Sequence, residues 1–473
     1  MTHRIYILLL TIALAFSSCE SFVEPGAPKT EIPLELAFSD DKTATASVVG
    51  IYARMNNLNY QFANVLSLIL PGMMADEMAY AFAFATYDEF RDNNVLSSNM
   101  YVDIFWSSLY QYIYQANACI EGLEKADNLN PQVKSQLLGE AKFIRAFCYF
   151  YLVNYFGDVP LILTTDALAN NHRPRTPAAE VYTNIIDDLK AAKEQLFDGY
   201  PAGERADADG ERIRPNKGAA SALLARAYLY TGQFELAETE ASQVIGNSQY
   251  QLLASEDIND VFLINSAEAI WQLQAINIAG GRNTWEGFLM VPATETAGAF
   301  FQLVPGGLAD AFEEGDLRRE NWVGERVSAT TGTEHLFPYK YKVRFGVTPV
   351  QEYTMVLRLA EQYLIRAEAR LAQDKFADAE ADLNVIRGRA GLDMLDLGDD
   401  ADALREALEQ ERRIELFAEW GHRWFDLRRW PSNTGGAGKT RADDVLAPVK
   451  PAWQPSAIYL PLPDEAIRTN PNL

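Results

Sequence analysis

One helical pattern occurs twice in this chain of 473 residues, and the two copies limit the fold to a mostly α-helical one. The segment Leu224–Leu229 aligns with Arg366–Leu371. The offset continues through the residues that follow, matching Phe234 with Phe376, Ala237 with Ala379 and Glu238 with Glu380. Small alanine side chains allow two helices to pack closely, and the aromatic residue after the turn fills the gap between neighbouring pairs. We therefore predict a scaffold of stacked helical hairpins.

Further segments with a helical period extend this scaffold along the chain. The predicted helices are Asp40–Met55, Tyr101–Lys125, Gln132–Tyr155, Glu180–Leu196, Asn216–Thr231, Glu235–Ile245, Leu357–Gln373, Ala377–Arg389 and Ala401–Arg429. The paired helices look like degenerate tetratricopeptide repeats. Ordinary helical hairpins are the alternative interpretation.

The stretch from Ile258 to Tyr353 has a different composition, rich in Gly, Thr, Asn, Pro and aromatic residues. Its short β-like runs include Ala269–Leu273 and Tyr339–Val343. We predict a single domain over residues 39–473, with an irregular region at about 258–353. Long irregular segments on a rigid scaffold commonly carry the binding residues.

Charge and cysteine content exclude several classes of function. The chain has 41 basic and 65 acidic residues, for a net charge of −24, whereas nucleic-acid binding requires clustered basic residues. Its three cysteines and four histidines have no metal-site spacing, so we predict neither a metal nor another cofactor. Cys119 and Cys148 are predicted to be buried free thiols, with a disulfide as the alternative.

The N-terminus has the layout of a secretory signal. Arg4 precedes an apolar run, Ile5–Phe16, which is shorter than the roughly 20 residues needed to cross a bilayer. Two serines and Cys19 follow. We predict a lipoprotein signal peptide over residues 1–18, an acylated Cys19 and an extended tether over residues 19–38. The alternative is an ordinary signal peptide cut near Ser18.

Several motifs occur in a characteristic order along the chain. They are Glu140–Phe150, Asn154–Pro160, Glu411–Trp430, Tyr459–Glu465 and Asn470–Leu473. With the lipoprotein start, they resemble the SusD/RagB family of nutrient-binding outer-membrane lipoproteins, although Phe16 stands where the lipobox prefers Leu.

The resemblance implies four tetratricopeptide-like pairs on one side and an irregular ligand-binding region on the other. It also implies a lipid-anchored protein on the exterior of the outer membrane. Such a protein acts as the lid of a SusC-like TonB-dependent transporter. The usual cargo is an oligosaccharide, some relatives bind peptides, and the family is not enzymatic.

Two other motifs have structural interpretations. The block Glu411–Trp430 places Glu411, Glu415 and Glu419 four residues apart, among arginines and aromatic residues. We predict buried ion pairs there rather than a catalytic carboxylate pair. Thr434–Thr440 resembles a phosphate loop, but it lacks the first glycine and a preceding strand, so a surface loop is predicted.

Aromatic side chains are the predicted ligand contacts, because a flat ring can cover the apolar face of a sugar. Two stretches combine aromatic and polar residues outside strong helical patterns, namely Asp76–Asn94 and Arg282–Trp322. The candidate binding residues are Asp76, Tyr80, Tyr87, Arg282, Asn283, Trp285 and Trp322. Core packing is the alternative role for Trp285 and Trp322.

Three functions are compatible with these features. The first is a surface lipoprotein that captures an oligosaccharide and delivers it to a SusC-like transporter. The second is a peptide-binding relative on the same scaffold. The third, a secreted glycoside hydrolase, has no supporting motif.

Overall fold

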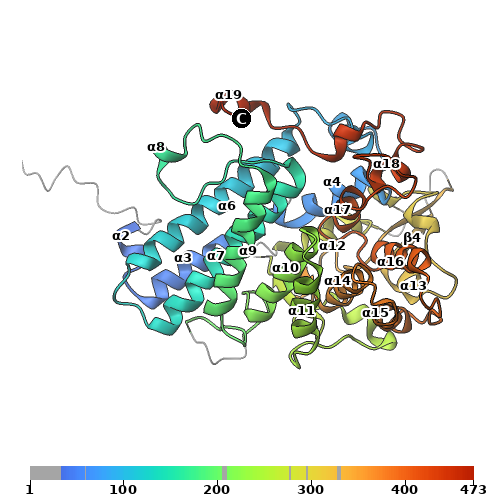
Figure 1. The fold of residues 1–473 in the computed structure, drawn as a ribbon. Helices are drawn as coiled ribbons and strands as arrows, with labels where there is room; N and C mark the ends of the chain where they lie inside the picture. Colours follow the sequence, from blue (N-terminus) through green and yellow to red (C-terminus); the bar gives the residue numbers. More distant parts are fainter. Residues whose placement is uncertain (1–33, 59, 205–209, 276–278, 295–296, 328–331) are drawn as a thin grey trace, which may run out of the picture.

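The computed structural model describes residues 34–473, apart from residues 59, 205–209, 276–278, 295–296 and 328–331. The predicted signal peptide, Cys19 and most of the predicted tether therefore lie outside the described residues. Four long helices from the first half of the chain lie side by side (Figure 1), namely α3 (Asp41–Met55), α6 (Met100–Lys125), α7 (Pro131–Phe156) and α9 (Ala178–Gln195). Every residue from 143 to 156 of α7 is buried, which explains why its sequence is apolar around the whole helix.

The predicted hairpin repeat is confirmed. The first copy is α10 (Lys217–Tyr230) with α11 (Phe234–Ile245), and the second is α14 (Leu359–Leu371) with α15 (Phe376–Arg389). The turn residues Gly232 (φ 71°) and Asp374 (φ 58°) occupy matching positions, and both have left-handed backbones. Figure 1 shows α10, α11, α14 and α15 stacked in succession. The buried alanines at their contacts include Ala227, Ala237, Ala367 and Ala379.

The predicted single helix Ala401–Arg429 is wrong. The structure has α16 (Ala401–Glu415) and α17 (His422–Arg429), separated by a break in which Ala418, Trp420 and Gly421 all have positive φ. The break turns Trp420 into the core, where its indole Nε1 donates a hydrogen bond to the carbonyl oxygen of Met355 at 2.6 Å. Burial of this large ring outweighs the helical propensity of the segment.

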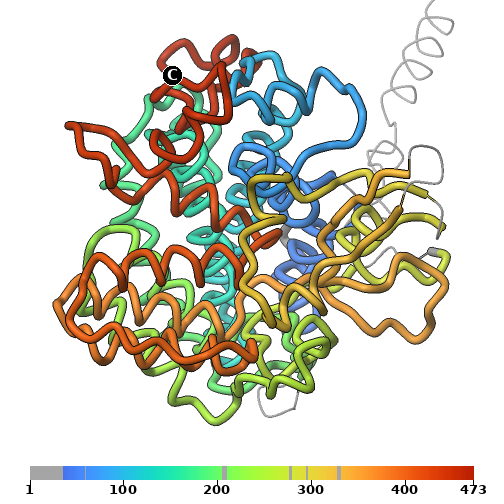
Figure 2. Tube along the Cα trace, turned by 90° about the vertical axis from the view of Figure 1, so that its right-hand side faces the viewer, coloured from blue at the N-terminus to red at the C-terminus, as the bar shows by residue number. Residues whose placement is uncertain are grey.

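The strands form three small antiparallel pairs. β1 (Met78–Tyr80) pairs with β3 (Phe301–Leu303), β2 (Ala269–Leu273) with β6 (Thr354–Arg358), and β4 (Val323–Val327) with β5 (Glu334–Pro338). The predicted strand Ala269–Leu273 is confirmed. In Figure 2 the irregular region, drawn in yellow, lies beside the blue N-terminal segment that carries β1.

The β-like run Tyr339–Val343 is not a strand. Its polar groups instead bond individually to buried partners. Lys340 Nζ donates to a carboxylate oxygen of Glu419 at 2.6 Å, and the hydroxyl of Tyr341 accepts a hydrogen bond from the backbone N–H of Met355 at 2.8 Å. The predicted helix Leu357–Gln373 also starts later, because residues 357 and 358 belong to β6.

Shorter helical segments connect these elements. They are α2 (Leu34–Ala37), α4 (Ser67–Met74), α5 (Ala85–Arg91), α8 (Ala167–Asn170), α12 (Trp285–Met290), α13 (Leu317–Trp322), α18 (Arg441–Leu446) and α19 (Asp464–Thr469), a π-helical turn at Phe62–Leu66, and 3₁₀ turns at Ser255–Asp260, Ala279–Gly281, Leu308–Asp310 and Pro455–Ile458. Within the part of the chain that the structure describes, none of the helices is both long and apolar enough to cross a membrane.

The predicted ion pairs of the Glu411–Trp430 block are confirmed. Glu415 is fully buried and contacts Arg318, Arg358 and Arg389. Burial opposes its ionisation, but the surrounding cations outweigh this and hold the pKa of Glu415 well below its ordinary value. These contacts attach α16 to α13, α15 and β6, so the network joins the helical scaffold to the irregular region.

Two smaller predictions are also confirmed. Cys119 and Cys148 are buried free thiols, and burial raises the pKa of Cys119 to about 12. Residues 433–439 of the glycine-rich segment are exposed, as expected for a surface loop. Asp444 holds one end of this loop in place. Its carboxylate accepts hydrogen bonds from the Ser432 hydroxyl at 2.7 Å and the Thr434 hydroxyl at 2.8 Å.

Candidate functional site

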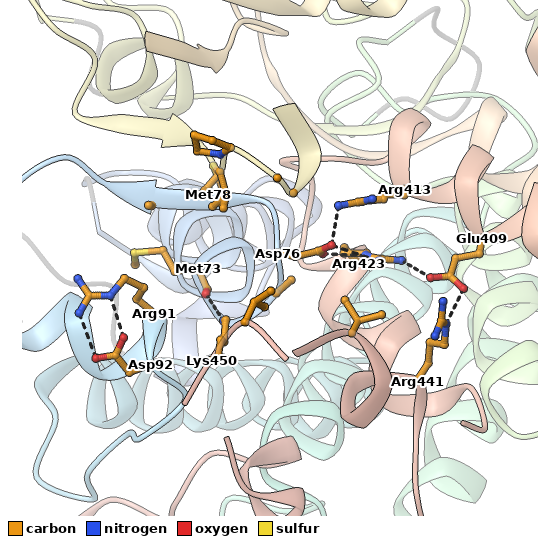
Figure 3. Close-up of a pocket in the computed structure, with 18 of the residues that line it drawn as sticks. Met73, Asp76, Met78, Arg91, Asp92, Glu409, Arg413, Arg423, Arg441 and Lys450 are labelled. Carbon is orange, nitrogen blue, oxygen red and sulfur yellow. Dashed lines mark hydrogen bonds and ion pairs between the residues drawn. The ribbon is translucent and has the colours of Figure 1, made fainter. Parts of the chain in front are cut away.

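A pocket of about 760 Å³ opens where the N-terminal segment, the irregular region and the C-terminal helices meet (Figure 3). Its volume is within the range of small-molecule sites. Its walls come from the end of α4, from β1, from the turn after β3, and from α16, α17 and α18. The turn after β3 is held to β1 because the N–H of Val304 donates to the carbonyl of Glu77 at 3.0 Å, and the N–H of Leu308 donates to that of Asp76 at 3.2 Å.

Asp76 is the acidic centre of the pocket. Its carboxylate lies 2.6 Å from Arg413 Nη2 and 3.0 Å from Arg423 Nε. Burial favours the neutral acid, but the two guanidinium groups outweigh it and hold the pKa of Asp76 at about 2. Glu409 extends the network by accepting from Arg423 at 3.0 Å and from Arg441 at 2.8 Å. Asp76 is thus a permanent anion that orients two arginines in the pocket wall.

Lys450 lies on the same wall and has only uncharged hydrogen-bond acceptors. Its Nζ donates to the carbonyl oxygens of Met73 at 2.7 Å and Met74 at 2.6 Å, and to Asn93 Oδ1 at 2.6 Å. Burial lowers the pKa of Lys450 to about 7. The nearby Arg91 is different, because it forms ion pairs with Asp88 and Asp92. In Figure 3 Lys450 lies between the Arg91–Asp92 pair and Asp76.

An exposed aromatic cluster begins where the pocket wall ends. Tyr80 follows the pocket residues Met78 and Ala79 on β1. The Tyr80 ring centre lies 5.7 Å from that of Phe82 and 6.4 Å from that of Phe84. Phe82, Phe84 and Phe300 are 57%, 41% and 40% exposed. We call Tyr80, Phe82, Phe84 and Phe300 the aromatic ledge. Grouped exposed rings of this kind commonly mark a binding surface.

Of the predicted binding residues, the structure brings Asp76 and Tyr80 to this site. Tyr87 supports the ledge from beneath, since it is buried and its ring centre lies 5.0 Å from that of Tyr80. Its hydroxyl also accepts a hydrogen bond from that of Tyr101 at 3.2 Å.

The other four predicted residues do not line the pocket. Trp322 is fully buried, and its Nε1 donates to the carbonyl of Ile258 at 3.1 Å. Asn283 is fully buried, and its Oδ1 accepts from the backbone N–H of Gln351 at 2.6 Å. Because a fully buried side chain cannot contact a ligand, we assign Trp322 and Asn283 to the core rather than to the binding site.

Trp285 and Arg282 form a buried stack. The Arg282 guanidinium lies 3.5 Å from the Trp285 ring centre, and the two residues are 7% and 6% exposed. Contact with the guanidinium covers one face of the indole, which leaves little of the ring for a sugar.

The sequence interpretation missed Phe300, Arg413, Arg423 and Lys450 as site residues. The two arginines belong to the charged block, where a pocket-lining arginine and a core arginine have the same local pattern. Phe300 lies in one of the two aromatic stretches, but its contacts with Ala81 and Phe82 are long-range. Lys450 belongs to no motif.

A helical-repeat scaffold with a polar pocket and an exposed aromatic ledge is the arrangement expected of a ligand-binding protein. Residues 38–229 match the family described as "Starch-binding associating with outer membrane", and residues 337–473 match the one described as "SusD family". The chain belongs to the SusD family, as the sequence motifs predict.

Individual relatives agree with this assignment over nearly the full chain. A SusD-like protein P25 of Formosa agariphila is 25% identical, covering 99% of this chain and 98% of the relative. A SusD superfamily crystal structure from Bacteroides thetaiotaomicron matches with a TM-score of 0.76 at 21% identity, covering 92% of this chain and 98% of that one. A structure named as a laminarin-binding SusD-like protein matches with a TM-score of 0.73 at 24% identity, with the same coverage.

Proposed function

We propose that this protein captures an oligosaccharide and delivers it to a SusC-like TonB-dependent transporter of the outer membrane. The observation that carries the proposal is the aromatic ledge beside a polar pocket. Rings such as Phe82 and Phe84 can remove the C–H face of a sugar from water, and the pocket side chains can pair with its hydroxyls. The laminarin-binding name of one structural neighbour supports a glycan as the ligand class.

The same proposal includes the predicted anchor. Acylation at Cys19 would hold the protein at the outer membrane, facing the cell exterior, on the tether before residue 39. The family description, which links its members to the outer membrane, supports this location. Two or more acyl chains suffice for stable anchoring, because each buried methylene contributes about 0.8 kcal/mol.

A binding role is favoured over glycoside hydrolysis by the carboxylates of the pocket. A glycosidase needs a carboxylic acid with a raised pKa as its general acid. Arginine contacts give the opposite shift to Asp76, whose pKa is about 2, and the pKa of Asp92 is also lowered, chiefly by its bond to Arg91. Burial raises the pKa of the neighbouring Glu77 to about 8, but that side chain is buried and does not line the pocket.

Isothermal titration calorimetry against neutral and acidic oligosaccharides and against peptides tests the proposal. We expect at least one oligosaccharide to bind, and the variant Phe82→Ala/Phe84→Ala to lose about tenfold in affinity per ring. Tyr114→Ala is the matched control, because Tyr114 is an exposed aromatic residue on α6, with 55% of its surface accessible. Binding of peptides alone, or release of reducing sugar, would replace the proposal with one of the two other functions.

A further inference from the structure

We propose that the pocket binds the anionic group of an acidic glycan, either a uronate carboxylate or a sulfate ester. This inference rests on the proposed function for the aromatic ledge and specifies the class of sugar. It concerns the charged pocket, whereas the ledge alone would serve neutral glycans equally well.

The charge of the pocket differs from that of the whole chain. Five cationic side chains line it, namely Arg91, Arg413, Arg423, Arg441 and Lys450. The carboxylates that line it are Asp76, Asp92, Glu406 and Glu409. The lining thus has one more basic than acidic side chain when Lys450 is protonated, which its pKa of about 7 places below neutral pH, on a protein whose net charge is −24. Such a local reversal of sign attracts an anionic ligand to this position.

Lys450 is the source of the surplus. All three protons of its ammonium group go to uncharged oxygens, and within the described residues no carboxylate lies within ion-pair distance. The charged groups that act on it from the neighbouring elements are Asp76, Asp92 and Arg91. Lys450 is partly buried, and a partly buried cation without an ion pair is costly, so an anion bound in the pocket would offset that cost.

Arg413 provides free hydrogen-bond donors. It has one ion pair, from Nη2 to Asp76 at 2.6 Å, and within the described residues its Nη1 has no hydrogen-bond partner, whereas its unpaired Nε is covered by protein. Arg423 differs, because Asp76 and Glu409 together accept from all three of its nitrogens. A guanidinium with free N–H groups matches the planar oxygens of a carboxylate or the oxygens of a sulfate.

The pocket and the ledge are placed for one extended ligand. The short β1–β3 ladder connects them, with Met78 and Ala79 in the pocket wall and Tyr80 in the ledge. At about 3.3 Å per residue, Phe82 is at most roughly 13 Å along the chain from Met78, because β1 ends at Tyr80 and a bend follows. An oligosaccharide of a few rings can therefore stack on the ledge while one substituent enters the pocket.

The test is calorimetry with three oligosaccharides of matched length, one neutral, one built of uronate residues without sulfate, and one neutral chain carrying sulfate. We expect an acidic sugar to bind at least tenfold more tightly than the neutral one, and the last two sugars identify which anion is preferred. Arg413→Gln and Lys450→Met should each weaken binding of the acidic sugar by more than they weaken binding of the neutral one, and so remove most of this preference. Lys42→Met, at an exposed lysine on α3, is the control.

The pH profile provides an independent readout. Affinity for the acidic sugar should fall as pH rises through about 7, where Lys450 loses its proton. Lys450→Met should reduce that dependence, and ionisation of Glu77, whose pKa is about 8, accounts for what remains. Thermal melting shows whether the variants are folded, and Arg413→Gln keeps the inference testable if Lys450→Met is not.

The outcomes distinguish failure of the acidic-glycan inference from failure of the proposed function. Equal or better binding of the neutral sugar, lost in the Phe82→Ala/Phe84→Ala variant, overturns the acidic-glycan inference and leaves the proposed function intact. Acidic-sugar binding that Arg413→Gln and Lys450→Met do not change also overturns it. Absence of binding by all three sugars overturns both claims.

Discussion

Arg226 on α10 and Glu361 on α14 form an ion pair with two N–O contacts of 2.6 Å, and both side chains are 2% exposed. The pair joins the first helices of the two hairpin repeats. Burial opposes the charged form, but Glu361 outweighs it and raises the pKa of Arg226. Removing one partner of a buried pair leaves the other charge uncompensated.

Glu361→Gln is expected to lower the free energy of unfolding by about 3–5 kcal/mol, because it leaves the Arg226 cation buried without its anion. Urea unfolding followed by circular dichroism measures this loss. Glu325→Gln breaks an exposed pair with Arg319 and should cost under about 1 kcal/mol. Equal losses in the two variants would contradict the role assigned to the buried pair.

Trp322→Ala should lower stability without a direct loss of binding, whereas Phe82→Ala should weaken binding with little change in stability. Trp322 is fully buried, so its truncation leaves a cavity that costs about 3–5 kcal/mol, with no direct loss of ligand contact. Phe82 is 57% exposed, so its truncation should change stability by less than about 0.5 kcal/mol and weaken glycan binding about tenfold. Chemical unfolding and calorimetry on the same samples distinguish the two. A stable Trp322→Ala variant that has lost binding would restore Trp322 as a ligand contact.

Glu77 makes stability depend on pH. It is buried beside Asp76, and burial together with the charge of Asp76 raises its pKa from 4.5 to about 8. The folded protein therefore holds this proton up to about pH 8, whereas the unfolded chain releases it near pH 4.5. The contribution of Glu77 is full below about pH 4.5 and is lost as pH rises towards 8, at up to roughly 1.4 kcal/mol per pH unit.

Glu77→Gln should remove this loss, because the amide stays neutral at every pH. We expect the difference in unfolding free energy, variant minus wild type, to grow between about pH 5 and pH 8. Urea unfolding across that range measures it, with the exposed Glu320→Gln as a control. A constant difference would mean that Glu77 is ionised in the folded protein.

Cys19→Ser tests the anchor. A serine cannot carry the thioether-linked lipid, so the protein should move from the membrane fraction to the soluble fraction of expressing cells. Fractionation followed by immunoblotting detects the shift. Cys119→Ser is the control, since that thiol is buried in α6. A variant that remains in the membrane fraction would argue against acylation at this position.

The repeat was predictable because its information is local. Alanine spacing and the aromatic residue after each turn place α10 with α11 and α14 with α15, and the bounds differ by only a residue or two. The break after Glu415 was not predictable, because residues 401–429 keep a helical pattern throughout. Only the space available for Trp420 beside Met355 explains why the helix stops there.

The candidate site, too, was predictable from the sequence only in part. Composition and pattern placed aromatic residues in two irregular stretches, and Tyr80 and Asp76 belong to the observed site. Whether a ring is exposed, like Phe82, or covered, like Trp322, depends on partners far along the chain. Arg413 and Arg423 were recognised as ion-pair formers, but their common partner Asp76 is more than three hundred residues away.

The amino-acid order alone determined the helical scaffold, the family and the acidic character of this protein, because spacing, motifs and charge are properties of neighbouring residues. The tertiary structure decided which aromatic residues face solvent and where the surplus positive charge lies. Burial and ion pairing depend on which distant segments meet, and here β1, the turn after β3 and the C-terminal helices meet around Asp76 and Lys450.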